Sequence, residues 1–254
     1  PEAGRYRAST QSIGDPSDIE RLAELLVQSE RPAVLLGTQV WTCRGHEDAT
    51  KLFKTLNVPC YMNGAARGVL PPGDPHYFNR TRGDAFSDAD VILIVGTPFD
   101  FRMGYGRRLR AEATVVHIDM DYRTVAKNRD VSLGLVGDPG AILKAVYAAV
   151  GEHRDNGAEG RIPWLAHLRR LEGERAAKLM PLFQSDANPI HPYRVAWELN
   201  ELLTEDTIYI GDGGDVGERP VTLGRRAVLP CARREQKVLE HLGLADRLLL
   251  RRLR

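Results

Sequence analysis

Cysteine is scarce in this sequence of 254 residues: the three present, Cys43, Cys60 and Cys231, are an odd number without CxxC spacing. This disfavours both a disulfide framework and a zinc site, and we expect a reducing, cytoplasmic compartment. An excess of charge of one sign is also lacking, because 35 Lys and Arg face 34 Asp and Glu. No global field therefore favours nucleic acid or a membrane surface as the partner.

Long apolar runs and several catalytic signatures are missing as well. No run is long enough to span a bilayer, and the opening "PEAGRYRAST" has no signal-peptide core. A start at Pro1 indicates an excerpt or a truncated product. No GxGxxG follows an expected strand, no HExxH pairs the seven histidines, and no GxSxG elbow occurs. An ordinary NAD dehydrogenase, a zinc enzyme and an α/β-hydrolase are therefore disfavoured.

What the sequence does contain is a regular alternation of amphipathic helices and short apolar strands. "SDIERLAELLVQSE" places Ile19, Leu22, Leu25 and Leu26 on one helical face, with Asp15 or Ser17 as the cap. Apolar strands follow in "PAVLLG", "VPCYM", "DVILIVG", "TVVHIDM" and "LGLVG", with helices in "GHEDATKLFKTLN" and "GAILKAVYAAV". Near-continuous apolar strands between helices predict a doubly wound parallel α/β sheet covered on both faces.

The alternation also predicts the domain organisation. We expect a linker over 1–14, one α/β domain over 15–150, a polar linker over 151–161, and the start of a second α/β domain over 162–216. Residues 12–150 are expected to fold on their own. Residues 217–254 contain no such alternation and are rich in arginine, so we interpret them as an aberrant or disordered tail. A basic amphipathic helix at a membrane surface is the alternative for this tail.

Glycines end three of the expected strands, at Gly37, Gly96 and Gly137. In a parallel sheet the carboxyl ends of the strands line the ligand crevice, where backbone N–H groups favour anions. Glycine is also the commonest way to turn sharply out of a strand, and each glycine alone is more simply explained so. Together the three outline a crevice.

Three stretches in order resemble the central domain of the acetolactate synthase-like enzymes that use thiamine diphosphate: "MNGAARGVLPPGDPHYF", "ADVILIVGTPFDFRMGYG" and "VVHIDMDYRTVAKNRDVSLGLVGDPGAIL". The resemblance covers roughly 12–150, and "NPIHPYRVAWELN" with "TIYIGDGGDV" resembles the start of the diphosphate-binding domain that follows. Family members have three α/β domains, of which the first supplies an activating glutamate. The resemblance therefore implies a fragment with a Rossmann-like central domain and an incomplete second α/β domain.

Relatives that hold FAD or ADP in this domain imply two further site residues. Arg102 matches the arginine of the family's "FDDR" and is expected at a phosphate, and Asp119 is expected to accept from ribose hydroxyls, with Asp121 as the near alternative. A solvated Arg102 and an Asp119 that caps the next helix are the structural alternatives. Phe101 replaces the family's second aspartate, which leaves the nucleotide's identity open.

The stretch Gly211-Asp212-Gly213 imitates half of a thiamine diphosphate motif, which holds Mg²⁺ through an aspartate and a later asparagine. The last asparagine of the chain is Asn200, so the second ligand is lacking. We expect Asp212 to approach the diphosphate in an intact enzyme without binding the metal. No catalytic residue and no metal ligand is assigned.

The resemblance implies an intact enzyme of branched-chain amino acid biosynthesis that joins a decarboxylated 2-oxo acid to a second carbonyl compound and forms a homo-oligomer. Thiamine diphosphate and Mg²⁺ are its implied cofactors, and the chain alone is expected to be inactive. Two alternatives stay open: a 2-hydroxyacyl-CoA or oxalyl-CoA lyase-type member, and a noncatalytic domain that binds a nucleotide or a partner chain.

Overall fold

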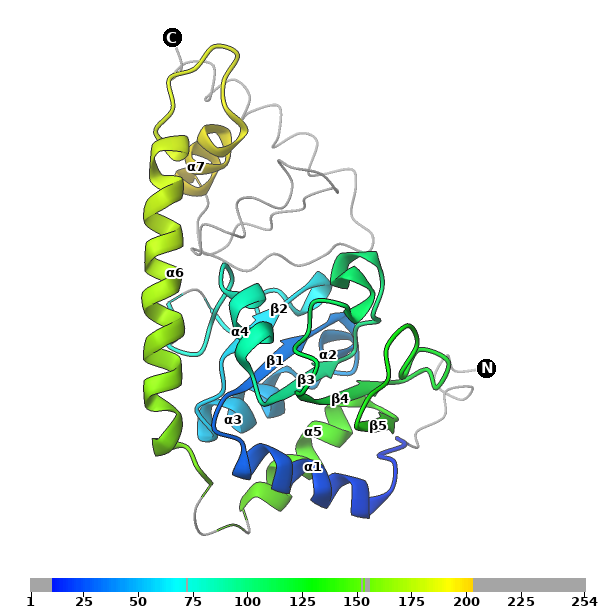
Figure 1. Ribbon diagram of the computed structural model, residues 1–254. Coiled ribbons are helices and arrows are strands. Elements are labelled where there is room, and N and C mark those ends of the chain that lie inside the picture. The colour runs from blue at the N-terminus through cyan, green and yellow to red at the C-terminus, as the bar shows by residue number, and fades with distance from the viewer. Residues whose placement is uncertain (1–10, 72, 152, 154–155, 203–254) are drawn as a thin grey trace, which may run out of the picture. The chain divides into compact units, whose positions relative to one another are not determined.

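The computed structural model describes residues 11–71, 73–151, 153 and 156–202 and contains a five-stranded sheet (Figure 1). All strand pairs are parallel, in the order β2-β1-β3-β4-β5. The strands are β1 (Pro32–Leu36), β2 (Cys60–Met62), β3 (Val91–Val95), β4 (Thr114–Asp119) and β5 (Leu133–Val136). The five apolar runs of the sequence thus form the sheet that their pattern predicts.

Both faces of the sheet are buried, which explains why its central strands are apolar throughout. In β1 and β3, Val34 pairs with Leu93, and every residue of these two strands is buried. Successive side chains alternate between the faces, so that Val34 belongs to one core and its neighbour Leu35 to the other. The alternation divides the interior into two cores on opposite sides of one sheet.

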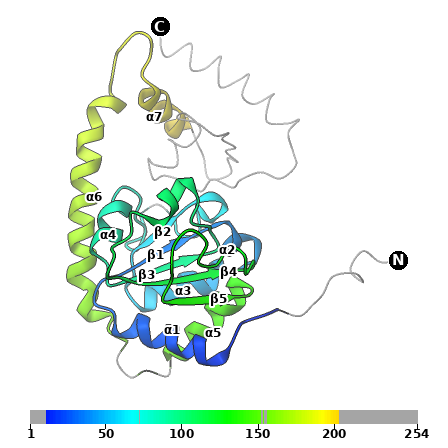
Figure 2. The same ribbon diagram turned by 45° about the vertical axis from the view of Figure 1, so that its right-hand side comes forward.

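Three helices cover the first face: α1 (Pro16–Gln28), α3 (His46–Thr55) and α5 (Pro139–Gly151). Figures 1 and 2 show them together on one side of the strands. Helix α1 begins where the sequence predicts, because the Asp15 carboxylate accepts from the backbone N–H of Ser17 at 2.8 Å. Its buried side includes Ile19, Leu22 and Leu26, as expected, while Leu25 is only half-buried.

The second face is covered by α4 (Arg82–Asp88) and the first turns of α6 (Ile162–Phe183). Helix α4 has only seven residues, and Trp164 and Leu168 of α6 complete this core beside Phe86. The remaining short elements are α2 (Thr38–Thr42), η1 (Gly64–Ala66), η2 (Phe101–Gly106) and η3 (Glu159–Arg161). The sheet therefore depends on residues beyond 150 for one of its two covers.

This packing differs from the domain boundaries expected from the sequence. A polar linker was expected over 151–161 and a new domain from 162, but the compact unit that holds the sheet extends to Ala177. The difference arises because α6 begins with apolar residues that the second face requires. An independent fold over 15–150 would leave that face without Trp164 and Leu168.

Two charged side chains of this segment attach it to the rest of the sheet domain. Arg161 is fully buried and donates to backbone carbonyls at the ends of α1 and α3. Glu172 accepts from the backbone N–H groups of Arg80 and Thr81, and from the Thr81 hydroxyl, at 2.9 to 3.2 Å. It thereby satisfies donors at the start of α4 from a separate helix.

The second compact unit begins at Lys178. Its described part contains the end of α6 and α7 (Pro192–Leu202), where the Phe183 ring contacts Tyr193 and Trp197. The stretch "TIYIG", Asp212 and the tail 217–254 lie outside the described residues, so the predictions for them remain predictions.

Candidate functional site

Gly37 and Gly96 bring the carboxyl ends of β1 and β3 into contact. The N–H of Gly37 donates to the carbonyl of Val95 at 2.7 Å, and the N–H of Gln39 donates to that of Gly96 at 3.3 Å. A Cβ on Gly37 would overlap the carbonyl oxygen of Gly96, and a Cβ on Gly96, whose φ is +64°, would lie 2.6 Å from the Cβ of Gln39. Both positions therefore require glycine, and the close approach of the two chains alone explains why.

Asp119 closes the same edge at the end of β4. The residue is 1% exposed, and its Oδ1 accepts from the Gln39 amide at 2.9 Å and from the Asp121 N–H at 2.8 Å. Its carbonyl accepts from the N–H of Gly137 at 3.1 Å. In the described part of the chain Oδ2 is buried and has no hydrogen-bond partner. A buried carboxylate oxygen without a donor costs free energy, which makes Asp119 the feature of this edge that most needs explanation.

Gln39 was not singled out in the sequence, yet it joins the ends of two strands. Its amide nitrogen donates to Asp119, and its amide oxygen accepts from the N–H of Met120 at 3.0 Å. The only signal in the sequence was a polar residue two positions after the glycine that ends a strand, and this pattern is too common to identify a site.

Asp119 does not cap a helix, which was the structural alternative for this residue. The segment that follows it consists of turns, and the Asp119 carboxylate accepts from the backbone N–H of Asp121 in this segment.

Beside this cluster, His117 is a buried ring without a titrating role. Its Nε2 donates to the carbonyl of Thr97 at 3.1 Å, and its ring lies 4.8 Å from that of Phe99. Burial lowers the pKa of His117, against the opposing effect of the Asp119 charge. The ring is therefore neutral near pH 7 and connects β4 to the segment that follows β3.

Arg102 lies in a different environment from these residues. Its Nε donates to Asp100 Oδ2 at 2.9 Å, its side chain is 61% exposed, and this guanidinium holds the pKa of Asp100 below its ordinary value. It lines a small cavity of about 110 Å³ together with Arg82 and Arg108. The structure thus joins Gly37, Gly96 and Asp119 through Gln39, whereas Arg102 belongs to a separate arginine-lined cavity.

Asp121 is the remaining acidic candidate among the described residues. Asp121 accepts from Arg123 at 2.7 to 3.1 Å, which lowers the pKa of Asp121 to about 2. Among the described residues, no group of three or more His, Cys, Asp or Glu side chains is arranged to hold a metal ion. In the same part of the chain, no helix combines the length and apolarity needed to cross a membrane.

Comparison with known proteins shows which family the sheet domain belongs to. The family model described as "Thiamine pyrophosphate enzyme, central domain" matches residues 19–146, half of the chain. The acetolactate synthase large subunit IlvG of Mycobacterium tuberculosis is 34% identical over 220 residues, covering 84% of this chain and 39% of the relative. The 2-hydroxyacyl-CoA lyase 2 of Danio rerio is 30% identical over 205 residues, covering 78% of this chain and 32% of the relative.

Among solved structures, benzoylformate decarboxylase from Polynucleobacter necessarius aligns with a TM-score of 0.64 at 17% identity, covering 90% of this chain and 42% of that one. This likeness concerns the fold alone. The chain spans about two fifths or less of the length of these curated relatives. By its sequence match, the chain belongs to the thiamine pyrophosphate enzyme family, and residues 19–146 are its central domain.

Proposed function

We propose that this chain is part of an acetolactate synthase-like enzyme, which in its whole form joins a decarboxylated 2-oxo acid to a second carbonyl compound. The observation that carries the proposal is the 34% identity over 220 residues to a protein named as an acetolactate synthase. The sheet domain is the noncatalytic central part of that enzyme. Thiamine diphosphate, when bound, would act as the electron sink that allows the 2-oxo acid to lose CO₂ and the remaining fragment to attack the second carbonyl compound.

We infer that the magnesium and diphosphate site of the intact enzyme belongs to the diphosphate-binding domain that the resemblance places after the central one. Asp212, which we expect near the diphosphate, lies outside the described residues. On this proposal the sheet domain supports the site from a neighbouring domain. We also infer that the intact enzyme is a cytoplasmic homo-oligomer.

Identity at a similar level to proteins named 2-hydroxyacyl-CoA lyase 2 supports a second candidate, cleavage of a 2-hydroxyacyl-CoA. The full open reading frame that encodes this chain should be expressed and assayed with thiamine diphosphate and Mg²⁺. Acetolactate formed from pyruvate supports the first candidate. Aldehyde released from a 2-hydroxyacyl-CoA, without turnover of pyruvate, would replace it with the second. The 254-residue chain serves as the control and is expected to turn over neither substrate.

We further propose that the carboxyl edge of the sheet binds the ribose of FAD or ADP through Asp119. Its Oδ2 is an acceptor without a donor, and a ribose hydroxyl would supply one. Because this oxygen is buried, the hydroxyl reaches it only after a neighbouring side chain moves. Arg102 is the candidate for the phosphate, and it would then be shared between the phosphate and Asp100.

Titration calorimetry of FAD and ADP against the 254-residue chain tests this proposal. Asp119→Asn keeps the size of the side chain and one oxygen, but replaces an acceptor by an NH₂ donor. We expect it to lower affinity by about tenfold or more, since a hydrogen bond to a charged group contributes about 1.5–3 kcal/mol. Arg102→Ala should lower affinity similarly, whereas Arg123→Ala, at an exposed arginine paired with Asp121, should not. Equal affinities in the parent chain and the three variants would show that Asp119 and Arg102 have structural roles and do not bind the nucleotide.

A further inference from the structure

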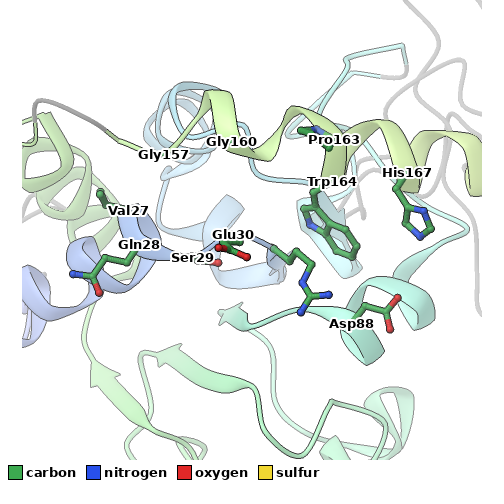
Figure 3. A pocket seen from close by; sticks show the side chains of 11 residues that line it. Val27, Gln28, Ser29, Glu30, Asp88, Gly157, Gly160, Pro163, Trp164 and His167 are labelled. Carbon is green, nitrogen blue, oxygen red and sulfur yellow. The ribbon is translucent and has the colours of Figure 1, made fainter.

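A groove of about 630 Å³ lies at the amino end of the sheet, at the opposite edge from Asp119. It is formed by the segment after α1, the end of α4 and the beginning of α6, and Figure 3 shows Trp164 and His167 projecting from α6 toward it. The indole N–H of Trp164 donates to the carbonyl of Pro32, the first residue of β1, at 3.0 Å. The volume falls within the range of small-molecule sites.

The backbone on one side of the groove is held by a hydrogen-bond network. The Asp90 carboxylate accepts from the Ser29 hydroxyl and from the backbone N–H groups of Glu30, at 2.8 Å, and Arg31, at 3.1 Å. Arg161 donates to the carbonyl of Ser29 at 2.9 Å from the other side. The segment 29–31 is therefore fixed in place, and a ligand that binds its side chains does not have to order its backbone.

The side chains on this frame carry charges of both signs. Glu30, Arg31 and Asp88 are exposed and line the groove, and in the described part of the chain these three side chains form no hydrogen bond or ion pair. Figure 3 shows Asp88, from the end of α4, across the groove from Trp164. The rings of Trp164 and His167 are nearly parallel, at 13°, with centroids 6.0 Å apart. Two carboxylates, one guanidinium and the exposed ring of His167, stacked on Trp164, thus surround one space.

We propose that this groove binds a zwitterionic ligand with an apolar body, of the class of aromatic amino acids. Arg31 presents a planar donor pair to a carboxylate, and the carboxylates of Glu30 and Asp88 accept from an ammonium group. The ring of the ligand packs against the exposed side chains of His167 and Pro163, beside the buried Trp164. Two carboxylates beside one arginine disfavour phosphate compounds, and the arginine disfavours ligands that carry only a positive charge.

Titration of the ¹⁵N-labelled 254-residue chain with L-phenylalanine tests the proposal. The indole N–H signal of Trp164, assigned through Trp164→Phe, and the backbone amides of Glu30 and Arg31 should shift together along one binding curve. 3-Phenylpropionate lacks the ammonium group and phenethylamine lacks the carboxylate, and each should bind about tenfold more weakly than L-phenylalanine. Unchanged signals at these three positions, or equal binding of all three compounds, would overturn the proposal.

Variants separate binding from folding. Arg31→Gln should weaken L-phenylalanine about tenfold and leave the weak binding of phenethylamine unchanged, whereas Asp88→Asn should weaken both compounds. Arg21→Gln is the matched control, because Arg21 is an exposed arginine of α1 that does not line the groove. The melting temperature of each variant should equal that of the parent chain. Equal loss of L-phenylalanine binding in Arg21→Gln and Arg31→Gln would show only a nonspecific effect of charge and would refute the site.

Discussion

Replacing Arg161 by lysine should destabilise the sheet domain far more than an ordinary surface substitution. The guanidinium is fully buried and makes five hydrogen bonds with backbone carbonyls. The acceptors are Ser29 at 2.9 Å, Leu56 at 2.7 Å, Asn156 at 3.0 Å, Val27 at 2.8 Å and Leu26. These carbonyls lie at or just after the ends of α1 and α3 and in the segment before η3. One side chain therefore connects three parts of the domain.

The expected loss of stability follows from the number of donors. A lysine has three N–H donors where an arginine has five, so at least two of the carbonyls lose their partner in Arg161→Lys. At about 1–1.5 kcal/mol for each buried carbonyl left without a donor, the free energy of unfolding falls by about 2–3 kcal/mol. For a domain of this size the melting temperature should fall by about 4–12 °C.

Urea denaturation followed by far-UV circular dichroism measures this change. Arg170→Lys is the matched control in the same helix, because Arg170 is exposed and pairs with Glu174, one turn away. Its effect should be at most about 0.5 kcal/mol. Hydrogen exchange should become faster in the last turns of α1 and α3 in Arg161→Lys alone. Equal urea midpoints for the two variants would refute the inference that Arg161 holds these helix ends.

Two further predictions concern the same domain. A chain truncated after Val150 should unfold or aggregate, whereas one truncated after Ala177 should give a cooperative thermal transition, because Trp164 and Leu168 complete the second core; equal melting temperatures would contradict this. Burial raises the pKa of Asp90, but hydrogen bonds from Ser29, Arg31 and Glu30 outweigh it and hold the pKa below its ordinary value. Asp90→Asn should therefore lower the urea midpoint at pH 7, and the difference should disappear as the pH falls below about 4, through the lowered pKa. Asp130→Asn, at an exposed carboxylate, is the control, and a difference independent of pH would show that the charge of Asp90 contributes nothing.

The sequence by itself determined the sheet and the family. Buried parallel strands need apolar residues on both faces, so "VILIV" and "PAVLL" identify β3 and β1 without any knowledge of their neighbours. The start of α1 can also be predicted from neighbouring residues alone, because Asp15 caps a helix that begins one residue later. The ordered series of motifs from 12 to 150 indicated the family that the comparison with known proteins shows.

Only the tertiary structure decided what the polar side chains do. Arg161 lay in a stretch that looked like a linker, yet it is buried and bonded to the carbonyl of Leu26, 135 positions earlier in the chain. Gln39 joins two strand ends, and Arg102 pairs with Asp100. The physical reason is that apolar burial follows a local periodicity, which a sequence displays. A hydrogen bond instead depends on which donor and acceptor the fold brings within about 3 Å. The sequence does not show which distant backbone group a polar side chain will reach.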